Sequence, residues 1–98
     1  MFVNYKVKSI KHSGRKGIRG TDCDNPKYKG VVGYQCRINV DDIKQFKPYQ
    51  FDLFSPVYDW WRTSEVLQVV CSVDNASYLE IETVNAIYTF ERIENETE

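Results

Sequence analysis

The sequence predicts an all-β domain, in which about six short strands form a strongly bent antiparallel sheet that closes into a small barrel. Apolar and polar residues alternate with period two along much of the 98-residue chain, as they do in strands with one buried face. Residues that favour turns separate the alternating segments, and no segment keeps the 3.6-residue apolar repeat of an amphipathic helix. We therefore expect little helix.

The first half of the chain contains three of the expected strands. Residues 3–8 alternate between an apolar face and a basic one, and residues 32–40 show the longest alternation in the chain. A short aromatic strand follows at residues 50–54. Residues 41–46 form the one segment that fits a single helical turn.

The alternation in the second half of the chain predicts a meander of three strands, at residues 65–73, 78–83 and 86–93. Asp74–Ser77 provides the first connection, and Val84-Asn85 provides a tight two-residue turn, since Asn tolerates a left-handed backbone. Small bent sheets of this kind close as SH3-like barrels, which we prefer, or as OB-like barrels. Residues 1–93 form the single expected domain, and the acidic tail 94–98 is expected to fray.

A long connection, residues 11–30, separates the first two strands and begins with basic residues interleaved with glycines. Glycines let the backbone approach a ligand, while Lys and Arg form charge-assisted bonds to phosphate or carboxylate. The loop lacks the Gly-Lys-Ser/Thr ending of a Walker loop. Two interpretations stay open, a loop that binds anions and a solvated loop whose charges maintain solubility.

Aromatic residues cluster between Phe46 and Trp61, where half of the chain's aromatic side chains fall. Trp60 and Trp61 are adjacent on an extended segment, so they must point to opposite faces. We expect one of them in the core and the other exposed beside Arg62. An exposed Trp at this position suits a protein interface, a proline-rich peptide or a nucleobase.

The two halves of the chain carry opposite charge. Residues 1–50 have a net charge of +7, and residues 51–98 have a net charge of −8. If the first and last strands are neighbours, Lys6 or Lys8 pairs with Glu80, Glu82 or Glu91, and the glycine-rich basic loop is left uncompensated. The acidic face repels nucleic acid, and it suits either solvent or a basic protein surface.

The residues needed for catalysis and for cofactor or metal binding are missing. His12 is the only histidine, and we place it in the long loop, where it cannot be held as a general base. Cys23 lies between two aspartates, which raise the pKa of its thiol. No cysteine and histidine spacing matches a metal site, so we expect neither an enzyme nor a cofactor.

The chain start and its hydropathy indicate a cytoplasmic protein. Polar residues interrupt the first residues, so no apolar signal segment is present, and no run is long enough to span a membrane. The three cysteines are accordingly expected to be reduced.

The C-terminal third carries a further pattern, Thr63-Ser64-Glu65-Val66 followed by a Val-rich strand and Thr83-Val84-Asn85-Ala86-Ile87-Tyr88. It resembles the C-terminal hairpins of small uncharacterised β-barrel proteins of gut bacteria and their phages. The resemblance implies an SH3-like barrel and an origin in a mobile element. It implies no active site.

These observations favour a non-catalytic binding module whose partner is a protein, such as a phage or mobile-element inhibitor of a host system. The alternatives are nucleic-acid binding through the basic first strand and loop, and binding of a small anionic ligand. The candidate binding residues are Lys11, Arg15, Lys16, Arg19, Tyr58, Trp60, Trp61 and Arg62.

Overall fold

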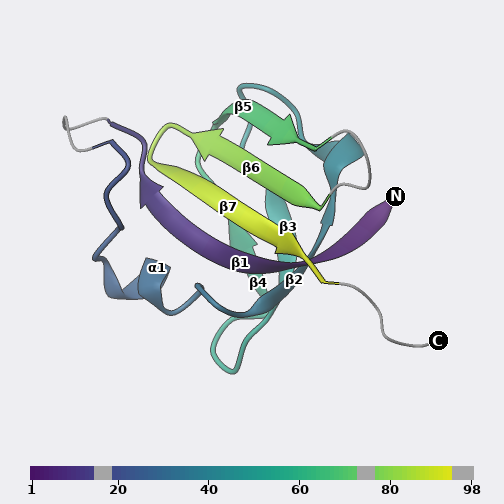
Figure 1. Ribbon diagram of the computed structural model, residues 1–98, viewed down its shortest axis with the longest axis horizontal. Coiled ribbons are helices and arrows are strands. Elements are labelled where there is room, and N and C mark those ends of the chain that lie inside the picture. The colour runs from purple at the N-terminus through teal and green to yellow at the C-terminus, as the bar shows by residue number, and fades with distance from the viewer. Residues whose placement is uncertain (15–18, 73–76, 94–98) are drawn as a thin grey trace.

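The computed structural model describes residues 1–14, 19–72 and 77–93. Within them the chain forms seven strands, a short helix and a 3-10 turn (Figure 1). In chain order these are β1 (Phe2–His12), α1 (Pro26–Lys29), β2 (Gln35–Asn39), η1 (Val40–Asp42), β3 (Gln50–Phe54), β4 (Trp60–Arg62), β5 (Val66–Cys71), β6 (Tyr78–Thr83) and β7 (Ala86–Arg92).

All seven strands belong to one antiparallel sheet with the order β4-β3-β2-β1-β7-β6-β5. The all-β class and the C-terminal meander are confirmed, as is the pairing of the first strand with the last. Hydrogen bonds between strands do not close the sheet, so the structure does not confirm the predicted barrel. The additional strand is β4, which is not among the six strands that the sequence predicts.

The sheet bends until strands from its two halves pack together. In Figure 1, β1, β7 and β6 cross in front of β2, β3 and β4. The Phe51 ring in β3 meets the Phe90 ring in β7 edge-on, with 5.6 Å between centroids, although two strands lie between them in the sheet. The core therefore lies inside the bend.

The loop between η1 and β3 forms backbone hydrogen bonds with the end strand β5. The Phe46 N–H donates to the Val66 carbonyl at 2.7 Å, and the Val66 N–H donates to the Lys47 carbonyl at 3.0 Å. Phe46 reaches this position with a positive φ of 68°, which is uncommon for a bulky residue. These bonds satisfy part of the outer edge of β5.

The predicted alternation holds where the chain is paired on both sides. Leu79, Ile81, Tyr88 and Phe90 are all buried, as the pattern of the last two strands predicts. The second strand is shorter than predicted. It begins at Gln35 because Gly33, with a φ of 96°, turns the chain just before it, so Val32 and Tyr34 are exposed and Val31 enters the core instead.

The long basic connection begins and ends later in the chain than predicted, at residues 13–34, and it contains the helix α1. Lys11 and His12 are the last residues of β1, opposite Ile87 and Ala86. Residues 15–18 lie outside the described part of the chain. After them the chain lies beside the end of β1 again, where the His12 N–H donates to the Thr21 carbonyl at 2.8 Å. The helix α1 follows, and the Asn25 side chain caps it by accepting from the Lys27 N–H.

The structure describes one of the predicted connections of the C-terminal meander but not most of the other. The turn at Val84-Asn85 is confirmed, because β6 ends at Thr83 and β7 begins at Ala86. Most of the Asp74–Ser77 connection and the whole tail lie outside the described residues. No helix in the described part of the chain is long and apolar enough to cross a membrane.

Candidate functional site

The β3–β4 hairpin and α1 together enclose a hollow of about 450 Å³, which we call the hairpin groove. Four of the predicted binding residues, the aromatic Tyr58, Trp60 and Trp61 and the neighbouring Arg62, all line this groove. Its lining residues are Lys27, Val57, Tyr58, Asp59, Trp60, Trp61 and Arg62.

Ser55 holds the hairpin in shape. Its Oγ accepts from the backbone N–H of Val57 at 3.2 Å and of Tyr58 at 2.8 Å, and it lies 3.1 Å from the Tyr58 carbonyl, to which the hydroxyl donates. The side chain therefore replaces backbone bonds that the turn leaves unmade. Val57 is presented at the tip and is 76% exposed.

Trp61 forms the inner wall of the groove. It lies opposite the buried Phe51 in the sheet and packs against Tyr58 and Tyr28, with centroid distances of 5.5 and 5.7 Å. Its indole N–H donates to the Tyr88 hydroxyl at 3.0 Å. Burial raises the pKa of Tyr88, so the phenol stays neutral at ordinary pH and the bond is maintained.

Trp60 points the other way and is 54% exposed, which confirms that the two tryptophans face opposite sides. Two further apolar side chains of the same hairpin are more than half exposed, Phe54 at 55% and Val57. Hydrophobic side chains clustered in this way on a surface mark interaction sites more often than isolated ones do.

Charged side chains surround these aromatic residues. Lys27 and Arg62 contribute two positive charges to the lining and Asp59 one negative charge, and all three residues are exposed. The candidate binding residues predicted from the sequence do not include Lys27, Val57 or Asp59. Val57 lies within the aromatic cluster that the sequence shows between Phe46 and Trp61, whereas nothing in the spacing of Lys27 links it to residues 57–62.

Of the predicted residues of the basic loop, the two that the structure describes, Lys11 and Arg19, do not line this groove. Arg19 forms a two-pronged ion pair with Glu82 of β6, at 2.7 and 3.0 Å, and also donates to the Ser13 carbonyl at 2.9 Å. The expectation that the glycine-rich loop is uncompensated is therefore wrong at Arg19. Arg15 and Lys16 lie outside the described residues, and Lys11 is a half-buried strand residue.

The acidic partner of Arg19 shows the effect of this contact. The hydrogen bond from Arg19 lowers the pKa of Glu82, against a smaller opposing effect of burial. The sequence also predicts that Lys6 or Lys8 of the first strand pairs with a glutamate of the last strands. In the sheet, Lys6 of β1 lies directly opposite Glu91 of β7. The opposite charges of the two chain halves thus meet on one surface.

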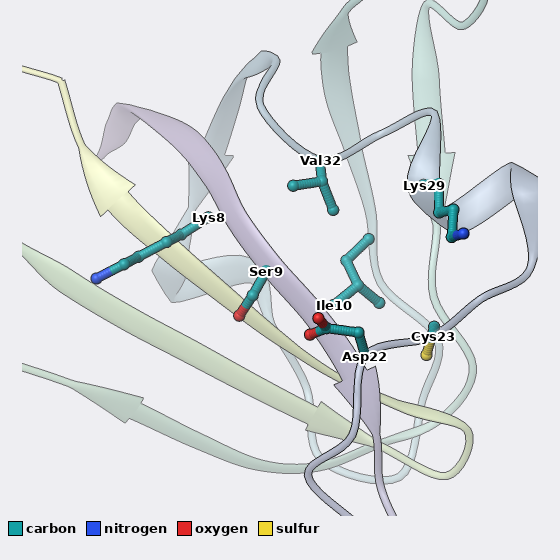
Figure 2. Close-up of a pocket in the computed structure, with 7 residues that line it drawn as sticks. All are labelled: Lys8, Ser9, Ile10, Asp22, Cys23, Lys29 and Val32. Carbon is teal, nitrogen blue, oxygen red and sulfur yellow. The ribbon is translucent and has the colours of Figure 1, made fainter.

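A second hollow, of about 320 Å³, lies beside β1 and is shown in Figure 2. Lys8 and Lys29 belong to its lining, but their side chains extend in different directions, away from the centre (Figure 2). The carboxylate of Asp22 is turned toward it instead. This arrangement does not gather positive charge around an anion.

Cys23 lines the same hollow and is 4% exposed. Burial, followed by the charges of Asp24 and Asp22, raises the pKa of its thiol. The predicted direction is confirmed, although burial and not the aspartates is the largest cause. Burial raises the pKa of Cys36 to about 12, so both thiols are protonated and poorly nucleophilic at ordinary pH.

The placement of His12 differs from the prediction, because it is a half-buried residue of β1 and not part of a loop. Among the residues that the structure describes, no group of three or more His, Cys, Asp or Glu side chains is placed to hold a metal ion.

Comparison of the chain with protein-family models, curated proteins and solved structures finds no match. The resemblance of its C-terminal third to SH3-like barrels stays a prediction.

Proposed function

We propose that this protein is a non-catalytic binding module that acts by occupying the surface of a partner protein through the hairpin groove. The observation that carries the proposal is the exposure of Phe54, Val57 and Trp60 on one hairpin beside a groove walled by Trp61. On the basis of the resemblance described above, we propose that the module is a phage or mobile-element regulator of a host system.

The physical chemistry of interfaces supports this function. Burial of apolar surface contributes about 25 cal/mol per Å², and Trp and Arg are enriched among the residues that contribute most to binding. The groove combines an exposed Trp60 with Arg62 and with a rigid wall, since Trp61 is fixed by its bond to Tyr88. A rigid wall reduces the ordering entropy that association must overcome.

Nucleic-acid binding is the second candidate, because the exposed ring of Trp60 lies in the same groove as Lys27 and Arg62. Stacking on an aromatic ring beside cations is how single strands are commonly bound. The structure supports it less, since Glu82 engages Arg19 and the lysines of the second hollow diverge. A small-anion site is supported less still for the same reasons.

Site-specific photocrosslinking tests the protein-binding function. A benzophenone amino acid at Val57, at the tip of the hairpin, is expected to give one discrete protein adduct in the native cells. The same group at Val70, which is also exposed but lies on β5, serves as the matched control. The Trp60→Ala change should abolish the adduct.

Adducts that are equal from Val57 and Val70, or none from Val57, would contradict this function. Retention of single-stranded oligonucleotides at about 50 mM salt, with steep loss as salt rises and with dependence on Trp60, would favour the second candidate instead.

A further inference from the structure

The strand beside the hairpin groove has an open edge. Among the described residues, β4 is the last strand of the sheet, with β3 as its one strand neighbour. The Leu53 N–H bonds to the Asp59 carbonyl at 2.9 Å, and the Thr63 N–H bonds to the Tyr49 carbonyl at 2.8 Å. Hydrogen-bonded pairs alternate in antiparallel ladders, so Trp61 directs its backbone groups toward β3. Those of Trp60 and Arg62 point away from the sheet.

The hairpin groove borders this open edge. Six consecutive residues, from Val57 to Arg62, line it, and its remaining lining residue, Lys27, comes from α1. The groove therefore lies between the edge of β4 and the helix. An extended chain placed here meets outward-pointing N–H and C=O groups that are spaced as in a sheet.

The side chains around the edge define what such a chain contains. On an added strand, residues opposite Trp60 and Arg62 share their face, whereas the residue between them faces inward beside Trp61. Arg62 and Lys27 complement a carboxylate, while Trp60 complements an apolar side chain. Asp59 follows Val57 and Tyr58 at the other end of the groove and disfavours a second carboxylate there.

We propose that the hairpin groove binds an extended segment of the partner as an added β-strand on β4, with a carboxylate side chain beside Arg62 and an apolar side chain beside Trp60. This inference rests on the proposed function and specifies the kind of partner segment that the groove takes.

Synthetic peptides provide the probe. Two capped peptides, Ser-Thr-Glu-Val-Phe-Thr-Ser and Ser-Thr-Phe-Val-Glu-Thr-Ser, present the same side chains for the two possible strand directions. Titration of the full-length protein, followed by amide chemical shifts, is expected to show saturable changes at Trp60, Trp61 and Arg62 with one of them. A peptide with Lys in place of Glu should bind about threefold to fivefold more weakly.

Backbone methylation separates an added strand from contacts through side chains alone. The N–H groups that face β4 depend on the direction of the added strand. In the antiparallel strand, formed by Ser-Thr-Glu-Val-Phe-Thr-Ser, those of Glu and Phe donate to β4, whereas in the parallel strand, formed by Ser-Thr-Phe-Val-Glu-Thr-Ser, that of the central Val donates. Methylation of a nitrogen that faces β4 should abolish binding, and methylation of one that points away should leave it within about twofold.

Charge exchange tests the position of the carboxylate. Arg62→Glu should weaken binding of the Glu peptide and restore that of the Lys peptide, which a merely structural role of Arg62 would not do. Lys27→Glu should act in the same direction. Lys29→Glu, on the same short helix but absent from the groove lining, is the matched control and should have no effect.

Three results would overturn the inference: no saturable shifts with either peptide, binding insensitive to methylation of the nitrogens that face β4, or equal affinity for the Glu and Lys peptides. If the Val57 photoadduct still forms and still depends on Trp60, the proposed function stands and only the added strand is refuted. If the adduct is absent as well, both are refuted.

Discussion

At the scale of single residues, the pairing of Arg19 with Glu82 changes how the charges of this chain are understood. Sequence separation hides the pair, because the two residues are 63 positions apart. The pair joins the basic connection to the acidic face of β6, and the Ser13 carbonyl shares the guanidinium. Arg19 must lose these contacts before it can bind another anion.

The lowered pKa of Glu82 makes this contact dependent on pH. A carboxylate whose pKa is depressed on folding stabilises the protein above its unfolded pKa, and the contribution is lost as the pH falls through the folded value. Glu82→Gln should therefore lower the melting temperature slightly at about pH 7 and have no effect at about pH 2. Thermal melts followed by circular dichroism check this, with exposed Glu65→Gln as control. An equal loss at both pH values would show that the pair does not contribute electrostatically.

The bond between Trp61 and Tyr88 gives the second prediction at this scale. Tyr88→Phe leaves the indole N–H without its acceptor and should reduce the free energy of unfolding by about 1 to 3 kcal/mol. Urea denaturation measures the loss, and Tyr34→Phe at an exposed position is the control. A difference between the two variants of less than about 0.5 kcal/mol would contradict a structural role for the bond.

At the scale of elements, local signals predict the strands well and predict their ends poorly. The alternation in β6 and β7 is correct residue by residue, because both strands are flanked by neighbours and have one face in the core. The ends of β1 and β2 depend on contacts from distant segments. Pairing with β7 extends β1 to His12, whereas Gly33 delays the start of β2.

The β3–β4 hairpin gives a prediction about an element. Ser55→Ala removes an acceptor shared by the amides of Val57 and Tyr58, so these amides should exchange with solvent about fivefold to tenfold faster. Native-state hydrogen exchange measures this, and the amide of Phe51 in the ladder should be unchanged. Uniform acceleration across the sheet would instead indicate global destabilisation.

The loop before β3 gives a second prediction about an element. Phe46 is exposed and has a left-handed backbone, which costs a residue with a side chain about 1 to 2 kcal/mol. Phe46→Gly should therefore keep or raise the free energy of unfolding, by up to about 1 kcal/mol, since glycine's own entropy offsets part of the relief. Destabilisation beyond about 1 kcal/mol in a urea titration would show that the ring contributes packing.

At the scale of the whole molecule, the bend brings the two halves of the sheet into contact. The rings of Phe51 and Phe90 meet edge-on across the core, and the Trp61–Tyr88 bond crosses at a second point. Both contacts connect the β3–β4 half with β7. The hairpin groove is consequently supported by residues far from it in the sequence.

A double-mutant cycle of Phe51→Leu and Phe90→Leu tests this connection. The two changes should be non-additive by about 0.5 to 1.5 kcal/mol, the value typical of an aromatic pair. Unfolding transitions followed by tryptophan fluorescence, which reports on β4, and by circular dichroism should coincide. Additive changes, or an earlier transition of the tryptophan signal, would show that the two halves are stabilised independently.

The sequence by itself determined the all-β class, the C-terminal meander, the tight turn at Val84-Asn85 and the opposite orientation of Trp60 and Trp61. Each follows from a period or a local backbone preference that acts over a few residues. The tertiary structure decided which tryptophan is exposed, which carboxylate binds Arg19 and that Lys27 joins residues 57–62 in one groove. These outcomes depend on how the sheet bends, and the bend brings together residues whose separation in the chain carries no periodic signal.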